Sequence, residues 1–265
     1  MIWDIFFQPF YDYGFMRRAL YGCIVISLGA TPIGVFLMLR RMSLTGDAMA
    51  CAILPGAAVG YLVSGLSLSS MTIGGVIAGL AVALLSGFVS RITALREDAS
   101  LAAFYIISLA LGVVIVSTRG SNVDLMHVLF GTVLALDNSA LILLCSITTL
   151  STLTMAIFFR PLVLECVDPQ FLRSVSNLST VTHFSFLALV VLNLVGGFHA
   201  LGTLMSVGIM ILPAAGARFW VVSLGGLITV AFVIAALSSL FGLLLSFNYS
   251  LPSGPAIILV AGLAY

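Results

Sequence analysis

The stretch MSLTGDAMACAILPGAA, from Met42 to Ala58, decides how the rest of the chain is interpreted. It holds one acid well inside an apolar run, Asp47, and a thiol four residues later, Cys51. In a helix this spacing places both side chains on one face, about one turn apart. A carboxylate and a thiolate are donors that transition metals accept, whereas lipid penalises a charged side chain. The stretch therefore predicts a metal-binding point on a membrane helix.

A purely structural interpretation of the same stretch stays open. Ser43 and Thr45 are typical of a helix start, where an acid in the first turn stabilises free backbone N–H groups. A single cysteine is also commonly just a small buried apolar residue. Pro55 and Gly56 follow one turn further on, where a membrane helix can bend and free backbone carbonyl groups. Spacing alone does not choose between a metal pair and a capping acid near a packed cysteine.

Composition defines the class of protein. The chain is 62% hydrophobic and 7% charged, with a mean hydropathy of +1.26, whereas a soluble domain carries about a quarter charged residues. We therefore expect an all-α, polytopic integral membrane protein. The net charge of +1 and the lack of a basic cluster give no reason to expect a nucleic-acid partner. All ten basic residues are arginine, and a P-loop needs a lysine, so ATP hydrolysis is expected in another chain and no catalytic residue is predicted here.

Nine apolar runs are long enough, or nearly so, to cross a bilayer, for which about 20 residues suffice. They cover residues 17–40, 46–64, 70–93, 99–117, 138–159, 180–197, 200–216, 219–247 and 252–264. Because the seventh and the ninth are short, eight crossings are the alternative. Residues 1–16 are rich in aromatic side chains, which favours an interfacial segment before the first crossing.

Arginine positions predict the orientation, because loops on the cytoplasmic side collect basic residues. Seven arginines fall on one set of alternating loops, namely Arg40, Arg41, Arg91, Arg96, Arg160, Arg173 and Arg218. Arg17, Arg18 and Arg119 fall on the other set. This distribution of seven arginines against three predicts that the N-terminus lies outside and, with nine crossings, that the C-terminus lies inside.

Two loops are longer than a turn. The outer loop, 118–137, contains Asp124 and His127, which share a face of a short helix and form a weak metal candidate, although such pairs are more often structural. His199, near the outer end of a short crossing, either lines a gate or is incidental. In the inner loop, 160–179, Asp168 followed by Pro169 is typical of a helix start.

The helix that starts at Asp168 would be amphipathic, with Phe171, Leu172 and Val175 as its apolar ridge. A short amphipathic helix between two crossings contacts either lipid or another protein. The pattern does not distinguish these partners.

The segment LRRMSLTGDAMACAILPGAAVGYL resembles the LRR-x-SL-x-GDA-x-x-H-x-x-LPG segment of permeases in ABC importers for zinc, manganese and iron. The resemblance continues in REDASLA (Arg96 to Ala102), HVLFGTVLA (His127 to Ala135), VDPQFLRS (Val167 to Ser174), ILPAAGAR (ending at Arg218) and LPSGPAIILV. It covers nearly the whole chain in the same order. It implies a single permease domain over residues 1–265, similar to type II ABC importer permeases, in a bacterial cytoplasmic membrane.

The resemblance also implies partners and roles. A homodimer of permeases would dock on a cytoplasmic ABC ATPase, which binds the ATP, and receive metal from an extracytoplasmic binding protein. No permanently bound cofactor is implied. The stretch Asp168, Pro169, Phe171, Leu172 and Arg173 matches the coupling helix that seats in the ATPase.

One position departs from the family pattern. Asp47 matches the pathway carboxylate, but Cys51 stands where the family usually has histidine. A thiolate is a softer donor than imidazole, so the exchange favours zinc over manganese, unless the second ligand has simply been lost. The rival functions are an ABC permease for a siderophore or vitamin and a secondary metal transporter. A membrane metalloprotease is disfavoured, since the chain has no H-E-x-x-H motif.

Overall fold

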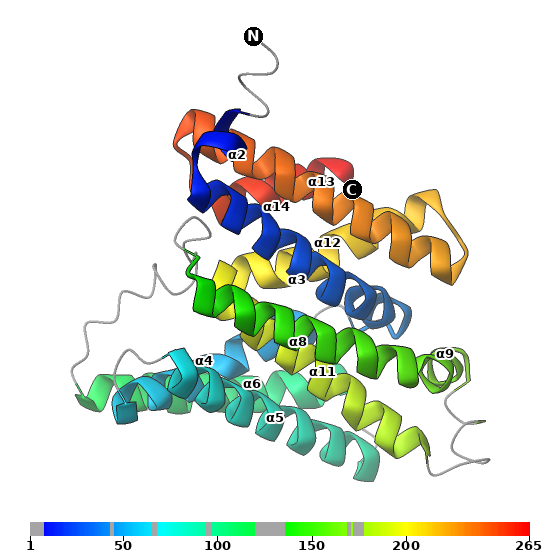
Figure 1. Cartoon of the computed structure of the whole chain (residues 1–265). Helices are drawn as coiled ribbons and strands as arrows, with labels where there is room; N and C mark the ends of the chain where they lie inside the picture. Colours follow the sequence, from blue (N-terminus) through cyan, green and yellow to red (C-terminus); the bar gives the residue numbers. More distant parts are fainter. Residues whose placement is uncertain are drawn as a thin grey trace. The chain divides into compact units, whose positions relative to one another are not determined.

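The computed structural model describes residues 8–42, 45–64, 68–93, 97–119, 136–168, 171 and 178–265. All regular elements within these ranges are α-helices (Figure 1). This follows from the apolar composition, because a helix satisfies its own backbone N–H and C=O groups where no water is present to do so.

The helices cover most of the described residues. In chain order they are α2 (Gln8–Asp12), α3 (Gly14–Leu39), α4 (Thr45–Ser64), α5 (Leu68–Ile92), α6 (Glu97–Arg119), α8 (Asn138–Ile157), α9 (Phe159–Val167), α11 (Leu178–Leu201), α12 (Thr203–Trp220), α13 (Leu224–Tyr249) and α14 (Ser253–Ala264). Each of the nine apolar runs predicted from sequence is one of the helices α3–α6, α8 and α11–α14, so the helices themselves are confirmed.

Six helices in the described part of the chain are long and apolar enough to cross a membrane. These stretches are Gly14–Leu39, Ser69–Ser90, Asn138–Ile157, Leu178–Phe198, Thr203–Trp220 and Leu224–Tyr249. Asp98–Val114, which is part of α6, and α14 are apolar stretches of fewer than 18 residues. The expected count of nine crossings is therefore not confirmed.

The described residues fall into two compact units. One contains those within Met1–Val35, Asp124–Thr149 and Gly196–Tyr265. The other contains those within Phe36–Val123 and Leu150–Val195, and it includes Asp47, Cys51 and the helix before Asp168.

Helices α4, α5 and α6 pack against one another in the second unit (Figure 1). The backbones of α4 and α5 meet at Gly56 and Gly74, where a Cβ on either residue would clash with the carbonyl oxygen of the other. On α6, a Cβ added at Gly112 would lie 2.8 Å from the ring of Pro55. The absence of side chains at these glycines lets the helix that carries Asp47 sit in close contact with both neighbours.

Helices α12, α13 and α14 pack against one another in the first unit. The short α14 fits between the other two through glycine contacts. Ile257 lies against Gly242 of α13, and Ile258 lies against Gly208 of α12.

Helix α3 ends in a left-handed residue that is not glycine. Arg41 has φ 58, and its N–H donates to the carbonyl of Met38 over 3.0 Å. The N–H of Met42 then donates to the carbonyl of Leu37 over 2.9 Å. These two bonds are the Schellman arrangement that closes a helix C-terminus and usually places glycine at the left-handed position.

Candidate functional site

Asp47 lies in the first turn of α4, as the helix-start residues before it predicted, and its side chain is exposed. The start of α4 is tied to α6, because the Thr45 hydroxyl lies 3.4 Å from Oδ1 of Asp98 and donates to it. A carboxylate in a first helical turn both stabilises the free N–H groups and stays open to a cation. The two interpretations of Asp47 are therefore compatible.

Cys51 follows one turn later on the same face of α4 and is half-buried. The residues that the structure describes contain no group of three or more His, Cys, Asp and Glu side chains able to hold a metal ion. Asp47 and Cys51 are thus at most a sparse site within one chain. A sparse site suits transient passage of an ion, whereas a four-ligand site suits permanent binding.

Pro55 adds a backbone feature to this face. It lies inside α4 and has no N–H, so the carbonyl of Cys51, four residues earlier, lacks its usual helical donor. The next carbonyl, of Ala52, accepts a hydrogen bond from the Ser108 hydroxyl of α6 over 3.3 Å. The carbonyl of Cys51, which points along α4 towards Pro55, is therefore left without its helical hydrogen bond.

The weaker metal candidates are not brought to this site by any described contact. Asp124 and His127 lie outside the described residues. His199 belongs to α11, but its side chain is not among those described.

The expected helix start at Asp168 has one observed contact. Asp168 ends α9, and its Oδ1 accepts a hydrogen bond from the N–H of Phe171 over 2.9 Å, which is the bond that an N-cap acid makes. Phe171 is 52% exposed, so an apolar ring is presented there. Pro169, Leu172 and Arg173 lie outside the described residues.

Sequence reasoning missed α9 and the buried polar cluster that it forms. The loop expected from residue 160 begins as this nine-residue helix, and Glu165 on its buried face pairs with Arg40 at the end of α3. The distance between Arg40 Nη2 and Glu165 Oε2 is 2.8 Å, and both side chains are 7% exposed. The only signal in the sequence was an acid on the apolar face of a short amphipathic stretch.

His183 of α11 completes this cluster. Its Nδ1 lies 3.4 Å from Arg40 Nη1 and 3.7 Å from Glu165 Oε1, and the imidazole is 4% exposed. The Arg40 guanidinium also stacks over the Phe186 ring of α11, with 4.5 Å to the ring centroid. The structure thus places His183 in a buried cluster with Arg40 and Glu165.

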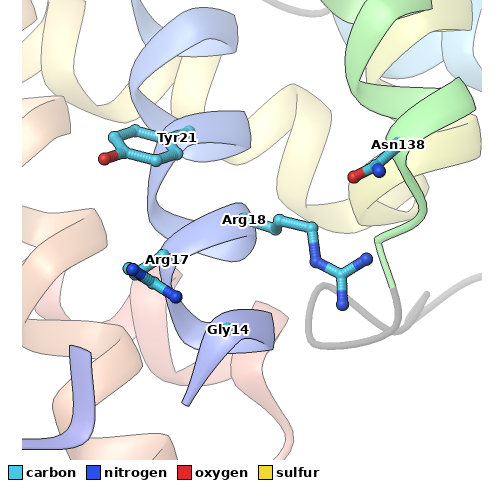
Figure 2. Close-up of a pocket in the computed structure, with 5 residues that line it drawn as sticks. All are labelled: Gly14, Arg17, Arg18, Tyr21 and Asn138. Atoms are coloured by element: carbon cyan, nitrogen blue, oxygen red, sulfur yellow. The ribbon is translucent and has the colours of Figure 1, made fainter. Parts of the chain in front are cut away.

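A cavity of about 400 Å³ lies at the start of α3, in the other unit. Figure 2 shows the residues that line it, which are Gly14, Arg17, Arg18, Tyr21 and Asn138. Two guanidinium groups repel a metal cation, so this cavity is not a metal site. Near this cavity, hydrogen bonds from the Ser139 hydroxyl and the Asn138 N–H lower the pKa of Asp137. The positive charge of Arg18 lowers this pKa further, as a smaller effect.

Comparisons with known proteins give a consistent result. The model of the ABC 3 transport family matches residues 12–265. The manganese transport system membrane protein MntC of Halalkalibacterium halodurans is 32% identical over 257 residues, which cover 97% of this chain and 87% of that protein. The chelated iron transport system membrane protein YfeD of Yersinia pestis is 26% identical over 265 residues, which cover 100% of this chain and 88% of that protein. A solved structure, PsaBC from Streptococcus pneumoniae in complex with Fab, matches with a TM-score of 0.85 and 28% identity over 100% of this chain and 94% of that chain.

Proposed function

The chain belongs to the ABC 3 transport family, as a membrane subunit of a metal-type ABC importer, and from this premise we propose that it conducts manganese or ferrous iron into the cell. The names of the relatives support these two cargoes, since they are manganese and chelated-iron transport proteins. The observation that carries the proposal is Asp47, which is exposed in the first turn of α4 and matches the family's pathway carboxylate.

The donors on α4 fit a passing ion. The carboxylate of Asp47 is a hard donor, which suits manganese and iron better than sulfur does. An ion that is held by few ligands is only partly stripped of water and can leave again. The site would then serve as a stop along the pathway.

Zinc is the second candidate cargo, and a specific residue favours it. The Cys51 side chain stands at the family's usual histidine position and is half-buried, one helical turn after Asp47. If the thiolate takes part, it binds zinc more strongly than manganese. The two cargoes therefore differ in whether the Cys51 sulfur contacts the ion.

The same premise leads us to propose the partners. ATP would be hydrolysed by a separate cytoplasmic ABC subunit, metal would arrive on an extracytoplasmic binding protein, and a second copy of this chain would complete a homodimer. The hydrogen bond between Asp168 and Phe171 and the exposed Phe171 ring support the use of this segment to contact the ATPase.

The test is metal uptake by the complete importer in proteoliposomes, measured separately with Mn²⁺, Fe²⁺ and Zn²⁺ together with ATP hydrolysis. Wild type should take up Mn²⁺ or Fe²⁺ in an ATP-dependent manner. Asp47→Ala should abolish uptake at matched expression and leave the complex assembled. Asp12→Asn, at an exposed carboxylate at the end of α2, is the matched control and should transport normally. Normal uptake by Asp47→Ala would refute the assignment, and transport of an organic chelate alone would refute the cargo.

A further inference from the structure

Helix α9 connects two places that matter for the proposed function. At its C-terminal end the chain passes directly to Asp168 and Phe171, in the segment proposed to contact the ATPase. On its buried face Glu165 pairs with Arg40, and the chain runs from Arg40 through one tight turn into α4 and Asp47. All of these residues belong to the same compact unit.

Apolar contacts already hold α9 in place. The rings of Phe159 and Phe36 meet edge to face with centroids 5.9 Å apart, and Leu162 is 1% exposed. Phe36 also meets Phe186 of α11, with centroids 6.5 Å apart. The polar cluster is therefore not needed simply to attach α9.

What Arg40 and Glu165 add is an attraction between two buried opposite charges. Removing two charges from water is costly, and apolar residues of similar size often stabilise such a site as well or better. The pair is an ion contact of 2.8 Å, although Nη2 and Oε2 do not meet at hydrogen-bonding angles. At this distance and burial, however, separating the two charges costs more than separating apolar side chains, so the two groups should stay together when either one moves. The Phe186 ring and the His183 imidazole hold the guanidinium from the side of α11.

The turn after Arg40 links the position of Arg40 to the position of the candidate metal site at the start of α4. Arg41 is left-handed, Met42 bonds back to Leu37, and the N–H of Thr45 donates to the carbonyl of Met42 over 3.1 Å. Asp47 follows within the first turn of α4. Hydrogen bonds thus join Met42 both to the end of α3 and to Thr45 at the start of α4, so we expect a shift of Arg40 to displace the start of α4.

We propose that Arg40 and Glu165 are positioning residues that transmit movement of the segment after α9 to the turn that carries Asp47. Neither residue contacts the ion or the nucleotide. Their pairing makes the ATPase-facing segment and the start of α4 move together. This inference rests on the proposed function, because it presupposes an ATP-driven importer whose ion passes Asp47.

The experiment measures how many Mn²⁺ ions enter proteoliposomes per ATP hydrolysed, using the complete importer. The variants are Glu165→Gln, the charge exchange Arg40→Glu with Glu165→Arg, and the apolar pair Arg40→Met with Glu165→Met. Arg160→Gln, at an exposed arginine on the same helix, is the matched control. Co-purification of the ATPase with the permease measures binding of the ATPase, whereas uptake per ATP measures how well ATP hydrolysis drives transport.

In Glu165→Gln we expect the ATPase to stay bound and hydrolyse ATP, while uptake per ATP falls by about two- to thirty-fold. The charge exchange should recover much of that loss, and Arg160→Gln should behave as wild type. The apolar pair carries no unpaired buried charge, so it should fold even if Glu165→Gln does not, and it should be uncoupled in the same way.

Three outcomes would overturn the inference. One is uptake per ATP at the wild-type level in the apolar pair, and another is loss of ATPase binding in a folded Glu165→Gln protein. The third is a charge exchange that recovers nothing while remaining folded. Failure of the proposed function looks different, because the wild-type importer itself would then hydrolyse ATP without taking up Mn²⁺, Fe²⁺ or Zn²⁺.

Discussion

Gly56 of α4 and Gly74 of α5 face each other so closely that a Cβ on either one would collide with the carbonyl oxygen of the other. The obstacle is helical backbone, which cannot rotate away as a flexible side chain can. This contact sets the distance between α5 and the helix that carries Asp47 and Cys51.

Gly74→Ala should therefore destabilise the protein, by about 1–3 kcal/mol as in other overpacked contacts. The measurement is the thermal unfolding midpoint of the purified permease in detergent. Gly225→Ala is the control, since nothing lies within 4 Å of a Cβ placed there, near the start of α13. An equal midpoint for both variants would show that the two helices separate easily.

The orientation predicted from arginine can be tested with two exposed positions. Val167 at the end of α9 is 79% exposed, and Tyr11 in α2 is 85% exposed. In a chain whose four native cysteines have been replaced by serine, Val167→Cys should react with an impermeant maleimide only from the cytoplasmic side. Tyr11→Cys should react only from outside. The reverse pattern would invert the orientation and exclude an ATPase contact at Asp168.

The native thiol of Cys166 should react slowly at neutral pH. Burial raises the pKa of this thiol above its ordinary value, an effect that the positive charge of Arg40 partly opposes. Because the thiolate is the reactive form, maleimide labelling of the detergent-solubilised permease should still be increasing above pH 9.0, the ordinary pKa of a thiol. Val167→Cys in a Cys166→Ser chain provides the exposed neighbour for comparison and should reach its plateau at lower pH. Matching pH profiles would show that burial does not control the reactivity of Cys166.

Substitutions of Cys51 test whether its sulfur binds the ion or its side chain only packs. If sulfur binds the ion, Cys51→Ser should lower zinc uptake severalfold and leave manganese uptake less affected, since a hydroxyl is a poor soft donor. Cys51→His should retain transport and broaden it towards manganese or iron. If Cys51 only packs, Cys51→Ala should be tolerated and the bulkier histidine should be the damaging change. Zinc uptake at the wild-type rate in Cys51→Ala would show that Cys51 is not a ligand and would leave Asp47 alone as the predicted donor.

The sequence predicted the helices well, because apolar runs and their polar interruptions mark a membrane helix locally. The start of α4 is an example, since Thr45 and Asp47 lie in its first turn as expected. The crossing count was less predictable, because a helix as short as α14, with 12 residues, does not show by its length whether it crosses the membrane.

The buried cluster could not be predicted from sequence. Arg40 and His183 are 143 residues apart, and periodicity shows which face of a helix is apolar without showing what that face contacts. The break between α8 and α9 at Phe158 does have a signal in the sequence, because Pro161 has no N–H to donate to the carbonyl of Ile157 and favours the first turn of a new helix. The sequence therefore indicates a role for Arg40 in membrane orientation only, and it indicates no role for Glu165.

Arg41 closes α3 in a backbone conformation that costs a residue with a Cβ about 1 kcal/mol and glycine almost nothing. The same side chain is one of the seven arginines that predict the cytoplasmic side. Glycine at this position would make the helix end more stable while weakening the electrostatic bias that guides insertion. Folding stability and fidelity of insertion therefore compete at a single residue, and a screen that selects only for thermostability would be expected to choose against correct topology there.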